Sequence, residues 1–333
     1  MRAKNSISYS KYGYIFALPF FLAFMIFTFY PTLYTAILGF TDSQGLGGMQ
    51  NFDFLEDRFA NFRFVLENQS FRDAFFNTFR IWVLNFIPQI ILALALAAWL
   101  TNNRLNIRGK GFFKIMFYMP NIITAASIAI LFNSLFAFPI SPVNSILQLL
   151  GREPVNFLTS PDLSRAIVIF IQFWIWYGYT MIILIAGING ISPDLYEAGE
   201  IDGATGMQAF FKITLPNLRM VMLFLMVTSL IGGLNVFDIP RLFNNGGPTS
   251  ATTTLALFIY NWAFTGRYVY ALASAASMIM FAVIAVLSAG MFFLFSDRDE
   301  ARLQREIKQL RKKQKKAAKE LSANNNPKGV TTC

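Results

Sequence analysis

An acidic segment stands out in a chain that is otherwise strongly apolar. It runs from Asp194 to Asp202 and holds four acidic residues and no Lys or Arg. Ser192 can cap a helix here, with Pro193 at the first helical position and acids in the first turn, so the segment predicts a helix that ends near Asp202. Gly203 then suits the left-handed conformation common at helix ends. Such an acidic helix favours contact with a basic partner surface, and a solvated surface helix is the alternative.

A second short helix is expected over Met207–Thr214. Pro216 should end it, because proline lacks the backbone N–H that a helix interior needs. Residues 192–218 would then form a polar hairpin between two long hydrophobic stretches. A membrane protein has no folding need for such a hairpin, so its position favours the docking of another protein.

Neutral polar and aromatic side chains interrupt the hydrophobic stretches. Amides and carboxylates hydrogen-bond to hydroxyl groups, and aromatic rings stack on the C–H faces of sugars. Gln172, Trp176 and Tyr179 are spaced by four and three residues, so they share one face of a helix. The alternative for each residue is a contact between helices or a place in an interfacial aromatic belt. The candidate substrate-binding residues are Tyr179, Trp176, Gln172, Asn235, Asp238 and Asn133.

Composition excludes several kinds of chemistry. The chain has no His and its single Cys is Cys333, which rules out a His/Cys metal site, a disulfide framework and a Cys–His nucleophile. It lacks the G-x-x-x-x-G-K-[ST] phosphate loop, so it cannot hydrolyse ATP by itself. Its hydrophobic stretches hold almost no ionisable residues, which argues against a proton-coupled carrier. We therefore expect no catalytic residues, no metal and no cofactor on this chain.

Length and composition place the chain in a membrane. Of its 333 residues, 55% are hydrophobic and only 14% are charged, whereas a soluble domain has about 25% charged residues. A helix needs about 20 apolar residues to cross the hydrocarbon core. Six stretches qualify, so the predicted fold class is an all-α, polytopic membrane protein. The expected spans are 14–40, 78–100, 115–136, 166–188, 220–236 and 271–295.

The placement of Lys and Arg sets the expected orientation. The short loop 101–114 carries four cations and no acid, so this loop, the hairpin and both termini are expected on the cytoplasmic side. The net charge is +10, and 11 Lys and Arg residues follow Ser296. We expect this basic tail to attach to anionic membrane lipids, and we expect no nucleic-acid partner.

Three parts are expected along the chain. Residues 1–73 would hold the first span and an outer cap, residues 74–295 a core of five spans, and residues 296–333 the basic tail. On the outer side, 137–165 contains four prolines and should form an irregular folded loop. The apolar stretch 254–264 has only 11 residues and is expected to be re-entrant or interfacial.

Two motifs resemble those of a known family. Glu197-Ala198-Gly199, then Gly203, then I-T-L-P at residues 213–216 is similar to the coupling motif of ABC importer permeases, in which E-A-A, three residues, G and nine residues precede I-x-L-P. Gly199 replaces the third Ala. The second motif is N-N-G-G-P at residues 244–248, followed by T-T-L at 253–255 and A-F at 263–264. It resembles the signature of the carbohydrate permeases of the maltose and multiple-sugar type.

The resemblance covers about residues 12–295 and implies a type I importer permease. In that family the hairpin is a coupling helix that lies in a groove of an ATPase subunit. The implied partners are a second homologous permease, two ATP-binding subunits that hold ATP and Mg, and an extracellular solute-binding protein, in a bacterial or archaeal cell membrane. The residues implied in ATPase coupling are Glu197, Ala198, Gly199, Asp202, Gly203, Ile213, Leu215 and Pro216.

Other functions stay open at this point. A permease for glycerol phosphate or another polyol-derived substrate would need cations facing the cavity. A standalone channel or secondary carrier would work without ATPase subunits, and a scaffold that uses the hairpin only for docking would not transport. The outward cations that could serve a phosphate are Arg80, Arg165, Arg241 and Arg267.

Overall fold

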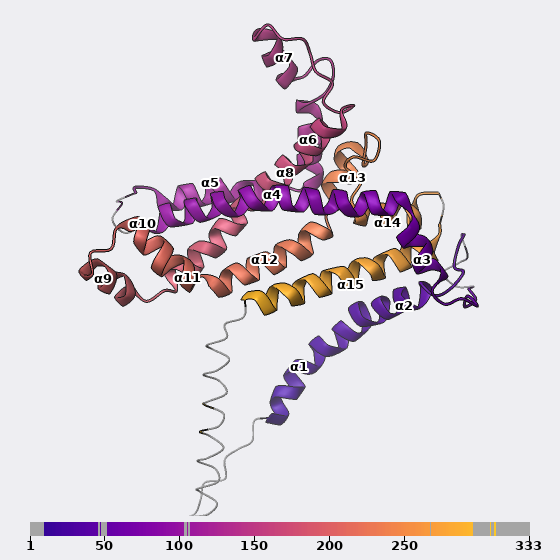
Figure 1. Ribbon diagram of the computed structural model, residues 1–333, viewed down its shortest axis with the longest axis horizontal. Coiled ribbons are helices and arrows are strands. Elements are labelled where there is room, and N and C mark those ends of the chain that lie inside the picture. Colours follow the sequence, from indigo (N-terminus) through magenta and orange to yellow (C-terminus); the bar gives the residue numbers. More distant parts are fainter. Residues whose placement is uncertain are drawn as a thin grey trace, which may run out of the picture.

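The structure is a computed structural model that describes residues 10–45, 47, 52–102, 105, 107–266, 268–295, 307 and 310. Over these residues the chain is built from helices, and its β-structure is limited to one isolated bridge between Thr41 and Phe54. Most of the long helices lie side by side in an elongated bundle, with a projection that carries α7 at its tip (Figure 1). The predicted all-α class is confirmed. The basic tail lies outside the described residues, apart from Ile307 and Leu310.

Five segments are long and apolar enough to cross a membrane. They match five of the expected spans, but the span expected at 78–100 begins at Gln69 and the span expected at 220–236 extends to Asn244. The first combines α1 (Ser10–Phe24), the π-helix η1 (Met25–Phe29) and α2 (Tyr30–Leu38), and the fourth combines α12 (Arg219–Leu234) with α13 (Asp238–Asn244). The others are α4 (Gln69–Thr101), α8 (Pro161–Asn189) and α15 (Tyr270–Phe295).

The third expected span, 115–136, is not one straight helix. The structure has α5 (Lys110–Ile122) and α6 (Ala125–Leu135), which meet at an angle of 89°. Ile123 and Thr124 are extended at the break, and the Thr124 side chain caps α6 by accepting a hydrogen bond from the Ser127 backbone N–H. The two helices count as a sixth span only if the bent pair is taken together. Apolar length alone did not reveal this break, although Pro120, Asn121 and the capping residue Thr124 lie beside it.

Short helices connect the spans. The stretch expected to be re-entrant is α14, an apolar helix of 10 residues. Asn144 organises the projection: its fully buried amide donates to the carbonyls of Ala137 and Val155 and accepts from the Val155 N–H. The short elements are α3 (Ala60–Glu67), α7 (Pro142–Leu149), α9 (Pro193–Ile201), α10 (Gly206–Ala209), the π-helix η2 (Phe210–Thr214), α11 (Leu215–Asn217) and α14 (Leu255–Phe264).

The core of the bundle is the pair α4 and α8, and α5 also packs on α8. Small residues let α4 approach α8 closely, because Ala93 and Ala97 of α4 are fully buried against Met181 and Leu184 of α8. Gly178 of α8 likewise lets α5 approach α8. A Cβ at Gly178 would lie 2.0 Å from the carbonyl oxygen of Phe117, so only glycine permits this contact.

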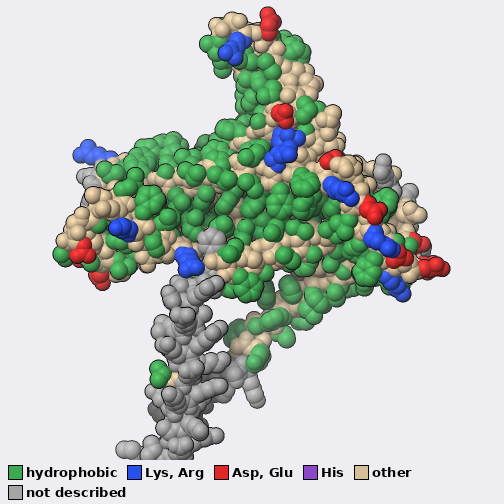
Figure 2. Space-filling view, in the orientation of Figure 1, with side chains coloured by type: hydrophobic (Ala, Val, Ile, Leu, Met, Phe, Trp, Pro, Cys, Tyr) green, Lys and Arg blue, Asp and Glu red, His purple; other side chains and the backbone are tan. Residues whose placement is uncertain are grey.

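The surface supports membrane embedding. On the face shown in Figure 2, hydrophobic side chains cover the broad middle, and charged side chains gather toward the two ends of the bundle and on the projection. The first span diverges from the bundle toward α1 (Figure 1), and none of its apolar window is buried within the chain. Lipid or another subunit must therefore cover it.

The contact at Gly178 leads to a stability prediction. Gly178→Ala should destabilise the chain by about 1–3 kcal/mol, because the added methyl group meets backbone atoms that cannot move aside. The melting temperature of the detergent-solubilised protein, followed by size-exclusion chromatography after heating, should fall. Gly290→Ala on α15 is the control, since a Cβ there meets nothing within 4 Å. Equal melting temperatures for the two variants would contradict the packing of α5 on α8.

Candidate functional site

The first candidate site is the hairpin between α8 and α12. Its first helix, α9, ends at Ile201, with Asp202 as the C-cap. Gly203 follows with a φ of +76°, as its position after an acidic helix predicted. Its N–H donates to the Glu200 carbonyl at 3.0 Å. The turn thus depends on a left-handed glycine and a backbone hydrogen bond.

The second half of the hairpin differs from the expected helix 207–214. It begins with a capping box between Thr205 and Gln208 and continues without a gap through α10, η2 and α11. Pro216 does not end it, because this proline lies in the first turn of α11, where no intrahelical N–H is needed. Here α12 begins only two residues after α11, at Arg219, so the hairpin leads almost directly into the next span.

Two contacts hold the halves of the hairpin together. The hydroxyl groups of Tyr196 and Thr214 lie 3.0 Å apart, and Thr214 is buried. Gly199 faces Ile213, and a Cβ at Gly199 would lie 2.8 Å from the end of the Ile213 side chain. The glycine that replaces the third Ala of the coupling motif therefore sits against the isoleucine of the same motif. A small shift of the flexible Ile213 side chain would admit alanine.

The outer surface of the hairpin combines acids with exposed apolar groups. Glu197, Ala198 and Asp202 are exposed, while Leu215 is half-buried and Pro216 is exposed. In Figure 2, red side chains mark this end of the bundle. Such a surface has the chemistry of a docking site, with apolar groups for burial and acids for a basic partner. The exposed large apolar residues of the hairpin are Leu195, Ile201, Met207 and Phe211.

The second candidate site is a cavity of about 240 Å³ between α4, α8 and α12. Its wall mixes aromatic rings, amides and hydroxyl groups with small residues of α12. Gly233 on α12 allows the indole ring of Trp82 on α4 to pack against it, because a Cβ at Gly233 would lie 2.1 Å from that ring. The lining residues are Trp82, Asn85, Gln89, Gln172, Trp176, Tyr179, Thr180, Leu225, Thr228, Ser229, Gly232, Gly233 and Val236.

Hydrogen bonds join the helices around this cavity. The Trp82 indole N–H donates to the Ser229 hydroxyl at 3.2 Å, which links α4 to α12. The Gln89 amide donates to the Thr180 hydroxyl at 2.7 Å, which links α4 to α8. Trp176 and Tyr179 meet edge to face, with ring centroids 5.8 Å apart. The wall is therefore preformed, with polar atoms and aromatic faces already in place.

Three of the six residues proposed for substrate binding line this cavity. Gln172, Trp176 and Tyr179 lie on one face of α8, as their spacing indicated, and all three reach the cavity wall. Whether they bind a substrate stays a prediction. Gln172 is buried, with 6% of its surface exposed, and it has no hydrogen-bond partner among the described residues.

The other three residues are placed elsewhere. Asn235 follows the last turn of α12, is exposed, and donates from its amide to the Ile231 carbonyl of its own helix at 2.7 Å. Asp238 is exposed in the first turn of α13. Asn133 donates to the Phe243 carbonyl at 2.8 Å and so joins α6 to α13. None of the three lines the cavity.

None of the three α4 residues in the wall was among those six proposed binding residues. Trp82, Asn85 and Gln89 come from α4, and Thr180 and Ser229 complete the polar wall. The spacing of four residues between Asn85 and Gln89 is a signal for one helix face. That face could be paired with α8 only once the packing of the helices was known.

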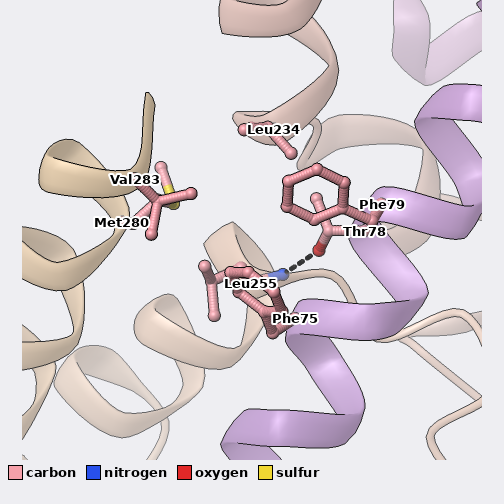
Figure 3. A pocket seen from close by; sticks show the side chains of 7 residues that line it. All are labelled: Phe75, Thr78, Phe79, Leu234, Leu255, Met280 and Val283. Atoms are coloured by element: carbon pink, nitrogen blue, oxygen red, sulfur yellow. Dashed lines mark hydrogen bonds between the residues drawn. The ribbon is translucent and has the colours of Figure 1, made fainter. Parts of the chain in front are cut away.

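A second, much smaller cavity lies between α4, α12, α14 and α15 (Figure 3). Its volume is only about 10 Å³, which is no more than one water molecule requires. Its wall is apolar except for Thr78, whose hydroxyl accepts a hydrogen bond from the Leu255 N–H at 2.8 Å. This cavity is a packing gap beside a helix cap and does not form a ligand site.

The N-G-G-P motif forms a loop that its own side chains hold together. The Asn244 amide donates to the Gly247 carbonyl, and the Thr252 hydroxyl donates to the Asn244 side chain. Asn77 on α4 donates to the Ser250 carbonyl. Arg165 on α8 donates to the Ala251 carbonyl. The motif therefore shapes the loop between α13 and α14, and the bonds from Asn77 and Arg165 fix this loop to α4 and α8.

Together these features describe a helical protein with membrane-length apolar segments, a cavity whose wall carries amides, hydroxyl groups and aromatic rings, and an acidic hairpin between α8 and α12. Comparison with known proteins identifies the family. Residues 81–298 match the family described as binding-protein-dependent transport system inner membrane component, and the chain belongs to that family. The resemblance to ABC importer permeases is thereby confirmed.

Relatives and solved structures are similar over most of their length. The lactose transport system permease protein LacF of Rhizobium radiobacter is 32% identical, over 87% of this chain and 96% of LacF. The trehalose/maltose transport system permease protein MalF of Thermococcus litoralis is 30% identical, over 83% of this chain and 90% of that MalF. A chain from the crystal structure of a bacterial ABC transporter involved in the import of the acidic polysaccharide alginate has a TM-score of 0.72 at 26% identity. The match covers 86% of the present chain and 95% of that transporter chain.

The link between Tyr196 and Thr214 leads to a prediction about the hairpin. Tyr196→Phe removes one hydroxyl group and keeps the ring, so it should cost about 0.5–1.5 kcal/mol of local stability. Hydrogen exchange at the amides of α9 and η2 should become faster by roughly threefold to tenfold, while α14 serves as the internal control. Unchanged exchange in α9 would show that this contact does not hold the hairpin.

Proposed function

We propose that this chain is a membrane permease subunit of an ATP-driven ABC importer for a sugar or oligosaccharide. The observation that carries the proposal is the cavity between α4, α8 and α12, where amides, hydroxyl groups and two aromatic faces meet in an apolar bundle. This is the chemistry that binds polyhydroxylated ligands. Relatives named as lactose and trehalose/maltose permeases support the same conclusion.

The cavity and the hairpin share their helices, which suggests how transport is coupled to ATP. α8 lines the cavity and ends at Asn189, four residues before α9 begins. α12 lines the cavity and begins directly after α11. A displacement of the hairpin by an ATPase subunit would therefore move two walls of the cavity. We infer alternating access on this basis, with Glu197 and the other motif residues in the coupling contact.

The proposed assembly contains a second homologous permease, two ATP-binding subunits and an extracellular solute-binding protein. ATP and Mg would bind to the ATP-binding subunits, and this chain would carry neither catalytic residues nor a cofactor. The exposed first span and the acidic hairpin support such an assembly, because each presents a surface that the chain itself leaves uncovered.

A glycerol phosphate or other phosphorylated substrate fits the cavity less well. None of the four cations considered for it lines the wall. Arg165 bonds to the Ala251 carbonyl and to Asp162, and Arg241 lies over the ring of Tyr260. Arg80 is exposed, and Arg267 lies outside the described residues.

The proposal is tested by reconstitution. The chain would be co-purified with its permease partner, ATPase subunits and binding protein, inserted in proteoliposomes and assayed with radiolabelled sugars. We expect uptake that requires both ATP and the binding protein. Uptake without ATPase subunits would indicate a standalone carrier or channel, and assembly without uptake of any tested solute would indicate a scaffold.

The coupling contact predicts the effect of two substitutions. Glu197→Lys reverses an exposed charge that should face basic groups. Gly203→Pro imposes a negative φ where the structure has +76° and removes the N–H that bonds to Glu200. Both variants should insert and fold but lose most sugar-stimulated ATPase activity and uptake, on the order of tenfold or more.

The control for these variants is Glu153→Lys, which reverses another exposed acid, in the loop between α7 and α8. It should keep wild-type uptake. Normal uptake in Glu197→Lys and Gly203→Pro, at wild-type expression, would refute the coupling assignment and leave the cavity assignment standing.

We further propose that both termini and the hairpin lie in the cytoplasm. Single cysteines at positions 53, 156 and 245 should then react with an impermeant maleimide in intact cells, after Cys333 is replaced. Cysteines at 108, 199 and 312 should react only after the membrane is opened. Labelling of position 199 from outside would overturn this orientation.

A further inference from the structure

The wall of the cavity carries hydrogen-bonding groups but no charge. Its lining residues include amides, hydroxyl groups and indoles, and none of them is Asp, Glu, Lys or Arg. We propose that the cavity admits only uncharged polyhydroxylated ligands and that α4, through Asn85 and Gln89, determines specificity by binding their hydroxyl groups. This inference rests on the proposed sugar-transport function and narrows its substrate class.

Asn85 and Gln89 each have hydrogen-bonding capacity left for a ligand. Both are buried, with 6% and 5% of their surfaces exposed. Asn85 donates once, to the Ile81 carbonyl of its own helix at 2.7 Å. Gln89 donates once, to Thr180. Within the described part of the chain no group donates to either amide oxygen, so both carbonyl oxygens are available to accept from a hydroxyl group.

Gln172 faces the same cavity from α8. It is as buried as Asn85, and neither its amide nitrogen nor its oxygen bonds to a described residue. The Gln172 amide atoms are not among the fully enclosed polar atoms, so they remain accessible to a ligand from the cavity. A hydroxyl group can both donate and accept, so one sugar can satisfy amides on α4 and α8 together. Trp176 and Tyr179 add aromatic faces for the C–H surface of the ring.

An acidic ligand would not be stabilised in this cavity. A carboxylate or phosphate would give up its hydration and meet no cation on this wall. Arg165 and Arg241 do not line the cavity and are held by other partners: Arg165 by the Ala251 carbonyl, and Arg241 by Asn245 and the ring of Tyr260.

The inference is tested by measuring sugar binding to the membrane complex in the absence of the solute-binding protein, so that the selectivity of that protein does not affect the result. The purified complex of this chain with its permease and ATPase partners would be examined by saturation-transfer NMR. The neutral probes are lactose, maltose, trehalose and glucose, and the acidic probe is digalacturonate. We expect saturation transfer to at least one neutral sugar and none to digalacturonate. Equal transfer to the acidic disaccharide would overturn the exclusion of charge.

Variants test the role of α4. Asn85→Ala and Gln89→Ala should each weaken binding of the neutral probe by about threefold to tenfold, the loss expected for one hydrogen bond. The matched control is Asn77→Ala, which removes a buried amide from the same helix. Asn77 bonds to the Ser250 carbonyl outside the cavity, so its loss should lower the melting temperature without changing sugar affinity.

The outcomes separate the inference from the function on which it rests. Unchanged sugar affinity in both Asn85→Ala and Gln89→Ala, with intact complexes, would overturn the assignment of α4. Weaker binding in the Asn77→Ala control by the same factor would also overturn it, because the effect would then be structural. No binding of any neutral probe, together with no ATP-dependent uptake, would refute the sugar-transport function itself.

Discussion

The close packing of α4 against α8 is the constraint on which the rest of the structure depends. Fully buried Ala93 and Ala97 let α4 and α8 approach each other closely, and Gly178 lets α5 approach α8. In lipid there is no hydrophobic force between helices, so such small residues and interhelical hydrogen bonds must hold the pair together. The bond from Gln89 to Thr180 supplies one of them at the edge of the cavity. The same packing therefore creates the stable pair and opens the polar cavity beside it.

The chain path then ties this cavity to the hairpin. Because α8 leads into α9 and α11 leads into α12, the hairpin is an extension of two cavity walls. Inside the hairpin, Gly203 sets the turn, and the contact between Tyr196 and Thr214 links the two halves. At the other end, the N-G-G-P loop is fixed to α4 and α8. The proposed coupling would therefore act through helices that are tied to other segments at both ends.

Sequence reasoning succeeded where local physics decides and failed where packing decides. Five spans, the acidic helix and the left-handed Gly203 follow from apolar length, capping and glycine preference, and the structure shows all of them. Apolar length did not reveal the 89° break between α5 and α6, because residues 115–136 are apolar on both sides of it. The place of Asn235 also depends on packing: its amide turns back to the Ile231 carbonyl of its own helix, and it does not line the cavity, so its role in binding stays a prediction.

The amides of this chain fall into two groups, and membrane physics explains the difference. Asn77, Asn133 and Asn144 each donate to a backbone carbonyl of another segment, and so they fix loops and helix ends. In a bilayer an amide without such a partner is expensive unless it faces water or a ligand. Gln172 has no such partner, Asn85 donates only within its own helix and Gln89 donates only to the Thr180 side chain, and all three lie on one cavity. An amide within a span that does not fix a loop or helix end, and that also lines a cavity, is therefore better evidence for a binding surface than its residue type alone.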